Sequence, residues 1–333
     1  MEITRKIQKI VPSLLALFLV GGLAAEVLAQ KAYPTKPVTL TVGYAPGGAT
    51  DVSARALGVA MEKIWGQPGI VVNKPGAATA VQMDFVKKSP PDGYTLGIFT
   101  SGGLTATHLR EVPYHFFDDF THFAQYGSFI FAVAVSSDSP WKTLKDLVDH
   151  AHKNPGKLRY GAVPAGTIGH LMAEQFAFLN KIKWVHVPFA GDSEAGAALL
   201  GNHLEVIVTT YSGWGPYVGA GKVRVLGVIH DNRLKEFPDV PTIKEAGFQD
   251  TGGFGLLGVF GPKNFPAQEK SKILSTLRAA VKDPEFIKVM DKQCAPAVYR
   301  EGEEWISYLK EFDSDTVKLM KMLGLKVVRE SYK

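Results

Sequence analysis

The sequence predicts an α/β protein in which two lobes are joined by two crossings of the chain. Short β-branched runs alternate with amphipathic helical patterns from residue 38 onward, which is typical of α/β units with a mostly parallel sheet. The chain has 333 residues, more than one compact core usually holds. Its last part, from residue 267, is helical and must pack on a sheet formed earlier, so the chain returns to its first lobe. Two crossings between two lobes are the covalent layout of a hinge.

The first 29 residues are predicted to be a secretory signal peptide with cleavage after Ala29. Three basic residues precede an apolar run over residues 10–25, and small residues follow this run. The alternative is a membrane anchor, which needs about 20 apolar residues. The run here is shorter and is broken by Pro12 and Glu26, so we expect an exported mature chain that starts at Gln30.

The composition favours a small anionic ligand over a nucleic acid. The formal net charge is +5, and the predicted leader accounts for one unit, which leaves +4. The basic residues are scattered, without the stripe of Lys and Arg that binds nucleic acid. Cys294 is the only cysteine, so no intrachain disulfide is expected, and we interpret it as a structural thiol.

The elements follow from hydrophobic periodicity, with period two for strands and 3.6 for helices. In order, we expect strand 38–42, helix 52–64, strand 70–73, a turn and helix over 76–86, strands 94–100, 120–126 and 131–135, helix 144–152, strand 158–163, helix 171–179, strand 184–188, helix 195–200, and strands 205–210 and 223–229. Thr143 is placed to cap the helix that follows it. After a Gly-rich apolar stretch over 255–261, three helices are expected, over 267–281, 285–292 and 302–323.

The position of the crossings sets the predicted lobes. We place the crossings near residues 127–133 and 250–256. The predicted domains are a signal peptide over 1–29, a first lobe of 30–130 plus 254–333, and a second lobe of 131–253.

A Gly-rich turn connects the first strand to the first helix. Gly47 and Gly48 leave the backbone without side chains, so a ligand atom can approach the N–H groups. Thr50 or Asp51 is placed to cap the helix, whose N-terminus favours an anion. Arg55 is interpreted as a structural partner of an acid in its own lobe. The alternative is a loop that only turns a corner.

A second Gly-rich turn, over residues 164–170, predicts a second anion site. Gly166 and Gly169 permit close approach to the backbone, and Thr167 supplies a hydroxyl group. His170 either bonds a ligand carboxylate or is a helix-face histidine held by a neighbour. Here too the alternative is an ordinary turn.

Hydroxyl and aromatic residues supply further candidates. Thr100 and Ser101 follow a strand end, where open α/β sheets place ligands, and hydroxyls bind a carboxylate without a fixed charge. A wall that sets ligand shape has four aromatic candidates: Tyr44, Phe189, Tyr211 and Trp214. Core packing is the alternative, and we favour it for Trp214.

Motifs for metal binding and catalysis are weak or missing in the sequence. His108, His115 and His122 recur every seven residues, but Pro113 interrupts any helix that would display all three, and no HExxH or paired-Cys motif is present. The run from Gly191 to Ala195 misses the GxSxG elbow at its last glycine, and no P-loop or GxGxxG occurs. We therefore predict no catalytic residue, no metal ligand and no cofactor.

Short motifs along the mature chain then carry a family resemblance. The motifs are Tyr33-Pro34-Thr35-Lys36-Pro37, Gly47-Gly48-Ala49-Thr50-Asp51 with Ala54-Arg55, Asn73-Lys74-Pro75-Gly76-Ala77, Pro91-Asp92-Gly93-Tyr94-Thr95-Leu96, Val187-Pro188-Phe189-Ala190-Gly191, and the run from Phe237 to Gly247. With these motifs in family order, the chain resembles the periplasmic solute receptors of tripartite tricarboxylate transport systems, the Bug-type receptors.

The resemblance implies a two-lobed periplasmic binding protein-like fold of class II, with the ligand in a cleft between the lobes. It also implies a periplasmic monomer that binds a small organic acid and delivers it to membrane transporter subunits, with no nucleic acid partner. The implied ligand-binding residues are Tyr44, Pro46, Gly47, Gly48, Thr100, Ser101, Ala165, Gly166, Thr167, Gly169, His170, Phe189, Gly191, Asp192 and Thr209. The alternatives are a periplasmic sensor subunit and a hydrolase acting on a small carboxylate.

Three departures from the family pattern bear on the ligand. In the family, the motif that follows Pro75 often reads Gly-Ala-Gly-Gly. Here it reads Gly76-Ala77-Ala78-Thr79, and the added methyl groups narrow the loop. Ala190 stands where a lysine is frequent. Thr209 stands where an acid is frequent, which disfavours an amino-acid ligand because a buried ammonium group needs a carboxylate partner.

Overall fold

The computed structural model describes residues 33–249 and 255–332, and the structural statements below refer to these residues. The chain divides into two compact units, residues 1–35 and 36–333, and all the elements described here lie in the second. The predicted signal peptide lies outside the described residues. In the described part of the chain, no helix has the length and apolar character that crossing a membrane requires.

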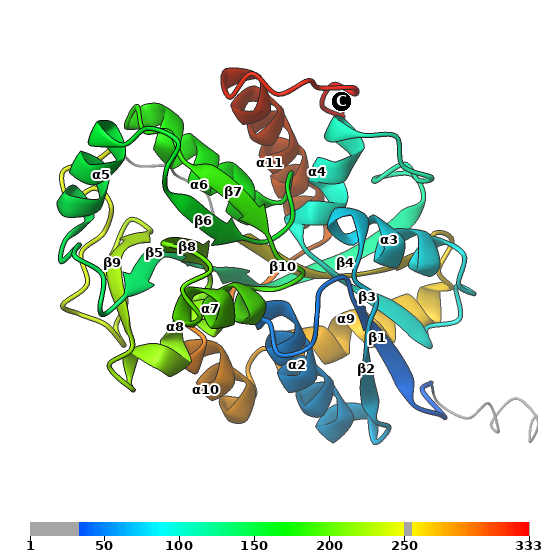
Figure 1. Cartoon of the computed structure of the whole chain (residues 1–333). Coiled ribbons are helices and arrows are strands. Elements are labelled where there is room, and N and C mark those ends of the chain that lie inside the picture. The colour runs from blue at the N-terminus through cyan, green and yellow to red at the C-terminus, as the bar shows by residue number, and fades with distance from the viewer. Residues whose placement is uncertain (1–32, 250–254, 333) are drawn as a thin grey trace, which may run out of the picture. The chain divides into compact units, whose positions relative to one another are not determined.

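The first of two sheets has six strands in the order β11-β4-β10-β3-β1-β2 (Figure 1). These strands are β1 (Val38–Val42), β2 (Gly69–Asn73), β3 (Thr95–Phe99), β4 (Phe120–Phe129), β10 (Gly255–Pro262) and β11 (Arg300–Glu301). In β1 the side chains of Val38, Leu40 and Val42 are fully buried, as expected for an apolar strand between two neighbours. We call the part of the molecule built on this sheet the first lobe.

The second sheet has five strands in the order β7-β6-β8-β5-β9. These strands are β5 (Phe131–Ser136), β6 (Arg159–Ala162), β7 (Val185–Pro188), β8 (Val206–Thr209) and β9 (Val223–Ile229). We call the part built on this sheet the second lobe. The first crossing is at Ile130, between β4 and β5, inside the predicted range 127–133. Most of the second predicted crossing lies outside the described residues, and the residue bounds of the lobes stay a prediction.

The prediction of mostly parallel sheets is wrong. The parallel pairs are β1 with β2 and β3, and β6 with β7 and β8. β10 is antiparallel to β3 and β4, and β5 is antiparallel to β8 and β9. The physical reason is the double crossing, because β5 and β10 each enter a lobe from the other one. A strand that enters in this way is antiparallel to the neighbouring strands whose carboxyl ends lead into helices.

The helices begin close to where periodicity places them, with two exceptions. They are α2 (Ala49–Trp65), α3 (Ala80–Lys87), α4 (Ser101–Leu109), α5 (Leu144–Lys153), α6 (Ile168–Leu179), α7 (Asp192–Leu200), α8 (Tyr211–Val218), α9 (Ala267–Ala280), α10 (Pro284–Lys292) and α11 (Gly302–Met322), with a short 3₁₀ turn, η1, over Ala77–Thr79. Thr143 caps α5 as predicted, through its side chain and the N–H of Asp146. α4 and α8 were not predicted, because glycines and Pro216 in them oppose helix formation and packing overrides that preference.

The C-terminal helices pack on elements of the first lobe. α9 contacts α2 and β4, α10 contacts α2, and α11 contacts α4 and β4. The chain end is held at α4 by a buried pair, in which His108 Nε2 lies 2.7 Å from Asp313 Oδ1 and both side chains are fully buried. The second carboxylate oxygen accepts from the N–H of Tyr332 at 2.7 Å. This network connects α4, α11 and the last described residues.

Candidate functional site

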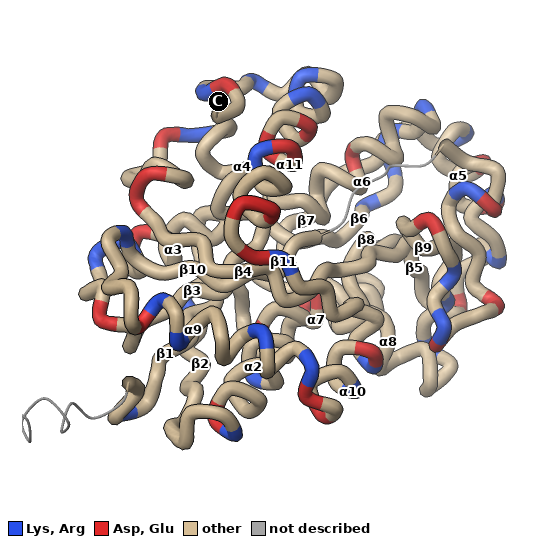
Figure 2. Tube along the Cα trace, turned by 180° about the vertical axis from the view of Figure 1, so that it is seen from behind, with Lys and Arg blue, Asp and Glu red and all other residues tan. Residues whose placement is uncertain are grey.

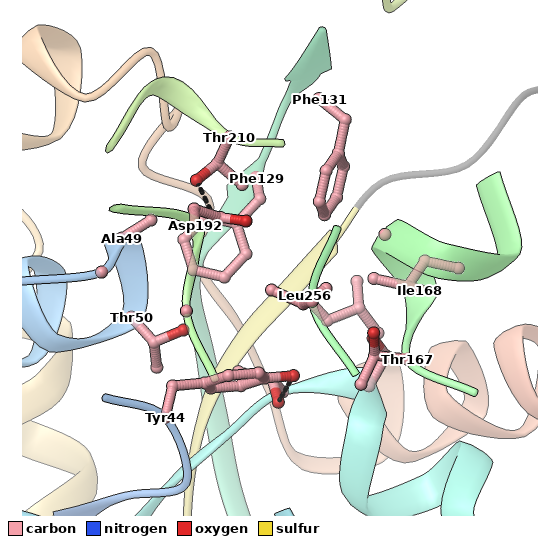
Figure 3. Close-up of a pocket in the computed structure, with 16 residues that line it drawn as sticks. Tyr44, Ala49, Thr50, Phe129, Phe131, Thr167, Ile168, Asp192, Thr210 and Leu256 are labelled. Carbon is pink, nitrogen blue, oxygen red and sulfur yellow. Dashed lines mark hydrogen bonds between the residues drawn. The ribbon is translucent and has the colours of Figure 1, made fainter. Parts of the chain in front are cut away.

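One cavity lies where elements of both lobes meet. About 430 Å³ of space between its lining atoms is not filled by protein, and this volume includes open solvent at the mouth. Its lining residues are Tyr44, Gly48, Ala49, Thr50, Thr100, Ser101, Phe129, Phe131, Val163, Thr167, Ile168, Gly169, Gly191, Asp192, Thr210 and Leu256. In Figure 3, Tyr44 and Thr50 from the first lobe lie around the same space as Thr167, Asp192 and Thr210 from the second.

The cavity is lined by the first residues of five helices: α2, α4, α6, α7 and α8. Their N-cap residues, all with extended backbone and none with a side-chain cap, are Gly48, Thr100, Thr167, Gly191 and Thr210. Two helices that start outside the cavity lining, α5 and α10, do have side-chain caps. Because the first N–H groups of a helix have no intrahelical acceptor, each uncapped start offers donors and a partial positive charge.

A repeated hydrogen bond shapes three of these helix starts. In each, the residue before the N-cap donates its N–H to the side chain of the third helical residue. The pairs are Gly47 to Asp51 Oδ2 at 3.0 Å, Gly166 to His170 Nδ1 at 3.3 Å, and Ala190 to Glu194 Oε2 at 3.2 Å. The side chain thus satisfies a donor outside the cavity. At α2 and α7 the N–H groups of the N-cap and the first turn remain for a ligand. At α6 the N-cap Thr167 donates its N–H to the carbonyl oxygen of Pro164 at 3.1 Å, so only the N–H groups of the first turn remain.

The predicted capping role of Thr50 or Asp51 is wrong, because α2 begins at Ala49, three residues before the predicted start at residue 52. Both residues lie inside the helix, and the N-cap is Gly48. The Asp51 carboxylate also accepts from Arg55 Nε at 3.0 Å, which confirms Arg55 as a structural partner of an acid in its own lobe. The side-chain N–H of Asn73 holds the same carboxylate at 2.9 Å, so Asp51 fixes the turn and is not part of the cavity lining.

The structure divides the fifteen predicted ligand-binding residues into two groups. Eight line the cavity: Tyr44, Gly48, Thr100, Ser101, Thr167, Gly169, Gly191 and Asp192. Seven do not: Pro46, Gly47, Ala165, Gly166, His170, Phe189 and Thr209. Gly47 and Gly166 instead have φ of 78° and 86°, which favours glycine and bends the chain into each helix start. Ligand contact by either group stays a prediction.

Eight lining residues are not among those fifteen: Ala49, Thr50, Phe129, Phe131, Val163, Ile168, Thr210 and Leu256. Phe129, Phe131 and Leu256 flank the crossings, so the predicted crossings were a usable signal for them. The strand end at Thr209-Thr210 was expected to contact the ligand, and of these two residues only Thr210 lines the cavity, because side chains alternate along a strand and its end. Thr209 is fully buried on the other side, whereas Thr210 reaches the cavity.

The aromatic wall differs from the predicted one. Trp214 is fully buried in the second lobe, which confirms core packing for this residue. Tyr211 and Phe189 pack partly buried against the same core. Tyr44 alone of the four predicted aromatics lines the cavity, together with Phe129 and Phe131.

The turn over Ala77–Thr79, which differs from the family pattern, lies behind the cavity and does not line it. Ala77, Ala78 and Thr79 have φ of 47°, 52° and 74°, a left-handed run in which glycine costs less. A Cβ on Gly102 would lie 3.1 Å from the Ala78 carbonyl oxygen and 3.1 Å from Tyr44 Oη. The turn therefore presses against the start of α4 and supports the Tyr44 side of the cavity from behind.

The loops of the two lobes touch at the rim of the cavity. Ser193 Oγ donates to the carbonyl oxygen of Gly47 at 2.8 Å, and the N–H of Ala45 donates to the carbonyl oxygen of Ala190 at 3.4 Å. On another side, Arg110 donates to the carbonyl oxygen of Ala165 at 3.2 Å. These three hydrogen bonds connect the two lobes around the cavity.

The described lining of the cavity contains no Lys or Arg, and its titratable side chains are Asp192 and Tyr44. Burial raises the pKa of Asp192 to about 6, against the lowering effect of Thr210. Burial raises the pKa of Tyr44 to about 12, so its hydroxyl is a neutral donor near Thr100 Oγ1. Elsewhere, Lys and Arg alternate with Asp and Glu along the outer helices in the view of Figure 2. Positive charge in the cavity lining therefore comes from backbone N–H groups.

His115 and His122, two of the three histidines that recur every seven residues, have separate structural partners. His115 pairs with Asp118, and His122 Nε2 lies 2.9 Å from the Phe116 carbonyl oxygen. Among the residues that the structure describes, no group of three His, Cys, Asp or Glu side chains is arranged to hold a metal ion. Cys294 is buried, and burial raises the pKa of its thiol to about 12.

Acid should weaken the fold through His170. Burial lowers the pKa of His170 to about 4, so Nδ1 accepts the Gly166 N–H in its neutral form. Because the unfolded state takes up the proton first, His170 alone should lower the free energy of unfolding by about 2–3 kcal/mol between pH 6.5 and pH 4. His122 and His186, whose pKa values burial also lowers to about 4, add to this fall. Urea unfolding across this range measures the slope. His170→Gln keeps a neutral acceptor, and an unchanged slope in this variant would contradict the assignment.

Comparisons with known proteins agree with this geometry. Residues 53–325 match the family model described as the tripartite tricarboxylate transporter family receptor. A UPF0065 protein of Cupriavidus necator is 31% identical over 92% of this chain and 92% of its own length. The periplasmic binding protein BugD has the same fold, with a TM-score of 0.84, 24% identity, and coverage of 88% of this chain and 99% of that one. An R. palustris protein solved with adipate has a TM-score of 0.82 and 25% identity, covering 88% and 99%. These likenesses confirm the predicted two-lobed binding-protein fold.

Proposed function

We propose that this chain, which belongs to the tripartite tricarboxylate transporter receptor family, binds one small organic carboxylate between its lobes and presents it to membrane transporter subunits. The observation that carries the proposal is the meeting of five uncapped helix starts at one cavity whose described lining has no Lys or Arg. Such a site attracts an anion through oriented N–H groups and leaves it able to dissociate. The adipate bound by the R. palustris relative supports this class of ligand.

The two sides of the cavity suggest how a ligand lies in it. On the first lobe, the N–H groups after Gly48 and the hydroxyls of Tyr44, Thr100 and Ser101 are donors for a carboxylate. The rings of Phe129 and Phe131, with aliphatic neighbours, form an apolar wall for the carbon chain. Micromolar binding requires about 8 kcal/mol, which several charge-assisted hydrogen bonds and an apolar body can supply.

We propose a receptor without a chemical step. In the hydrolase alternative Ser193 is the nucleophile, and a nucleophilic serine needs a base to accept its proton. Ser193 Oγ instead donates to the carbonyl oxygen of Gly47 at 2.8 Å and lies 3.4 Å from that of Ser212. Both partners are backbone oxygens, which position a loop and do not activate a hydroxyl. The proposed location is the periplasm, in keeping with the family.

A thermal-shift screen tests the function. A carboxylate that binds should raise the melting temperature by several degrees, because a ligand at 100 times its Kd adds about 2.7 kcal/mol to folding. Its primary amide has the same shape and no charge, and should give no shift at the same concentration. Aliphatic dicarboxylates, tricarboxylates, aromatic acids and amino acids form the test set. Equal shifts for acids and amides, or conversion of a bound acid to product, would contradict the proposal.

A further inference from the structure

Asp192 is an unexpected group in an anion site. It is the first residue of α7, its side chain lines the cavity, and it is only 6% exposed. One carboxylate oxygen, Oδ2, accepts a hydrogen bond from the Thr210 hydroxyl (Figure 3). The other, Oδ1, is buried with no hydrogen-bond partner among the described residues. Buried oxygens of this kind are rare and costly, because the group has lost its water without gaining a donor.

The position of Asp192 also reverses an expectation from the sequence. Thr209 and Thr210 at the end of β8 offer no acid for an amino-acid ligand. The structure brings an acid to that place from a different loop, because the Thr210 hydroxyl holds the carboxylate of Asp192. The side chain that the strand end lacks is thus supplied by the start of α7.

We infer that Asp192 selects a ligand that carries an ammonium group in addition to its carboxylate, which means an amino acid or a similar aminocarboxylate. The inference rests on the proposed function, since it assigns the second half of the same site. The ligand carboxylate lies at the helix starts of the first lobe, and the ammonium group donates to Asp192 Oδ1.

Charge balance favours this class over a dicarboxylate. The described lining residues include no Lys or Arg, so an ionised Asp192 has no cationic side-chain partner in the cavity. A dianion would add two negative charges to one that no side-chain cation of the described lining balances. A zwitterion brings one charge of each sign, and its ammonium group neutralises Asp192 at hydrogen-bond distance.

The titration of Asp192 gives the inference a direction in pH. Tyr44 is the other titratable group of the lining. The other titratable groups on α7 and on the elements packed against it are Glu194, Arg159, Tyr160, Tyr211 and Tyr217. Three of them have partners of their own: Glu194 accepts from the Ala190 N–H, Arg159 pairs with Glu205, and Tyr160 donates to Glu174. Burial raises the pKa of Asp192 to about 6, so its ionised fraction falls below that pH. Affinity for an amino acid should therefore weaken about tenfold from pH 7 to pH 5.

Calorimetry with matched ligands tests the inference. The ligands are the amino acid that gives the largest thermal shift, the same acid without its amino group, and the acid with a hydroxyl in that place. The wild-type protein should bind the amino acid about 100-fold more tightly than the deaminated acid, because that acid leaves a buried carboxylate unpaired. Asp192→Asn should reduce this preference to near one, with a melting temperature at pH 7 no lower than that of the wild type.

Glu194→Gln is the matched control, since it removes one negative charge from the same helical turn and keeps an acceptor for the Ala190 N–H. It should keep the wild-type preference. Equal or tighter binding of the deaminated or hydroxy acid by the wild type, tighter binding at pH 5, or an unchanged preference in Asp192→Asn would overturn the inference while the receptor function stands. If no carboxylate of any kind binds, the proposed function itself fails.

Discussion

Gly48→Val is expected to abolish carboxylate binding while the protein stays folded. Gly48 is the N-cap of α2, with φ of −74°, so its backbone accepts a side chain without strain. A Cβ there would have no neighbour closer than the Ala45 carbonyl oxygen at 3.5 Å. Gly48 nevertheless lines the cavity, and valine methyl groups would cover the N–H groups of the first helical turn. We expect a loss of affinity of at least about 100-fold, or 2.7 kcal/mol, by titration calorimetry.

The control for this variant is Gly219→Val. Gly219 ends α8 with φ of −61°, and no atom lies within 4 Å of the position that its Cβ would take. It does not line the cavity, so the same added volume should leave affinity unchanged. Wild-type affinity in Gly48→Val would show that the ligand does not use the start of α2.

Asp313→Ala should produce the largest loss of stability. The carboxylate of Asp313 is fully buried and accepts from His108 and from the N–H of Tyr332, both at 2.7 Å. Removing the carboxylate leaves the His108 ring and the Tyr332 N–H without their acceptor, and each buried donor left unsatisfied costs about 1–3 kcal/mol. Chemical denaturation should show this decrease in the free energy of unfolding, with loss of the contact between α11 and the last residues of the chain.

Asp315→Ala is the matched control on the same helix. Asp315 pairs with Lys318 at 2.8 Å, but its side chain is 64% exposed. An exposed pair of this kind contributes less than about 1 kcal/mol, so the variant should be close to the wild type. Similar losses in both variants would mean that burial of the pair with His108 does not stabilise the chain end.

The sequence was sufficient to predict most elements, because their apolar side chains repeat with a clear period. It was insufficient for α4 and α8, where Gly102, Gly103 and Pro216 lower helix propensity and contacts from distant segments decide the outcome. It also gave no strand for β10, whose apolar run has no alternation because all its residues are buried.

The candidate site was predictable only in part. Gly-rich turns after strands marked the starts of α2 and α6, but not which glycine lines the cavity and which one bends the chain. That division depends on the side chain of the third helical residue, which takes up one N–H in each turn. The meeting of Asp192 with Thr210 joins two loops whose distance in space no local pattern reveals.

The central claim is that backbone N–H groups at converging helix starts hold the negative charge of the ligand. Titration calorimetry of the wild-type protein with the best-binding acid and with its primary amide tests this claim most directly. The account predicts that the amide binds at least about 100-fold more weakly, because only the charged group gains from the helix starts. An amide that binds as tightly as the acid would contradict it.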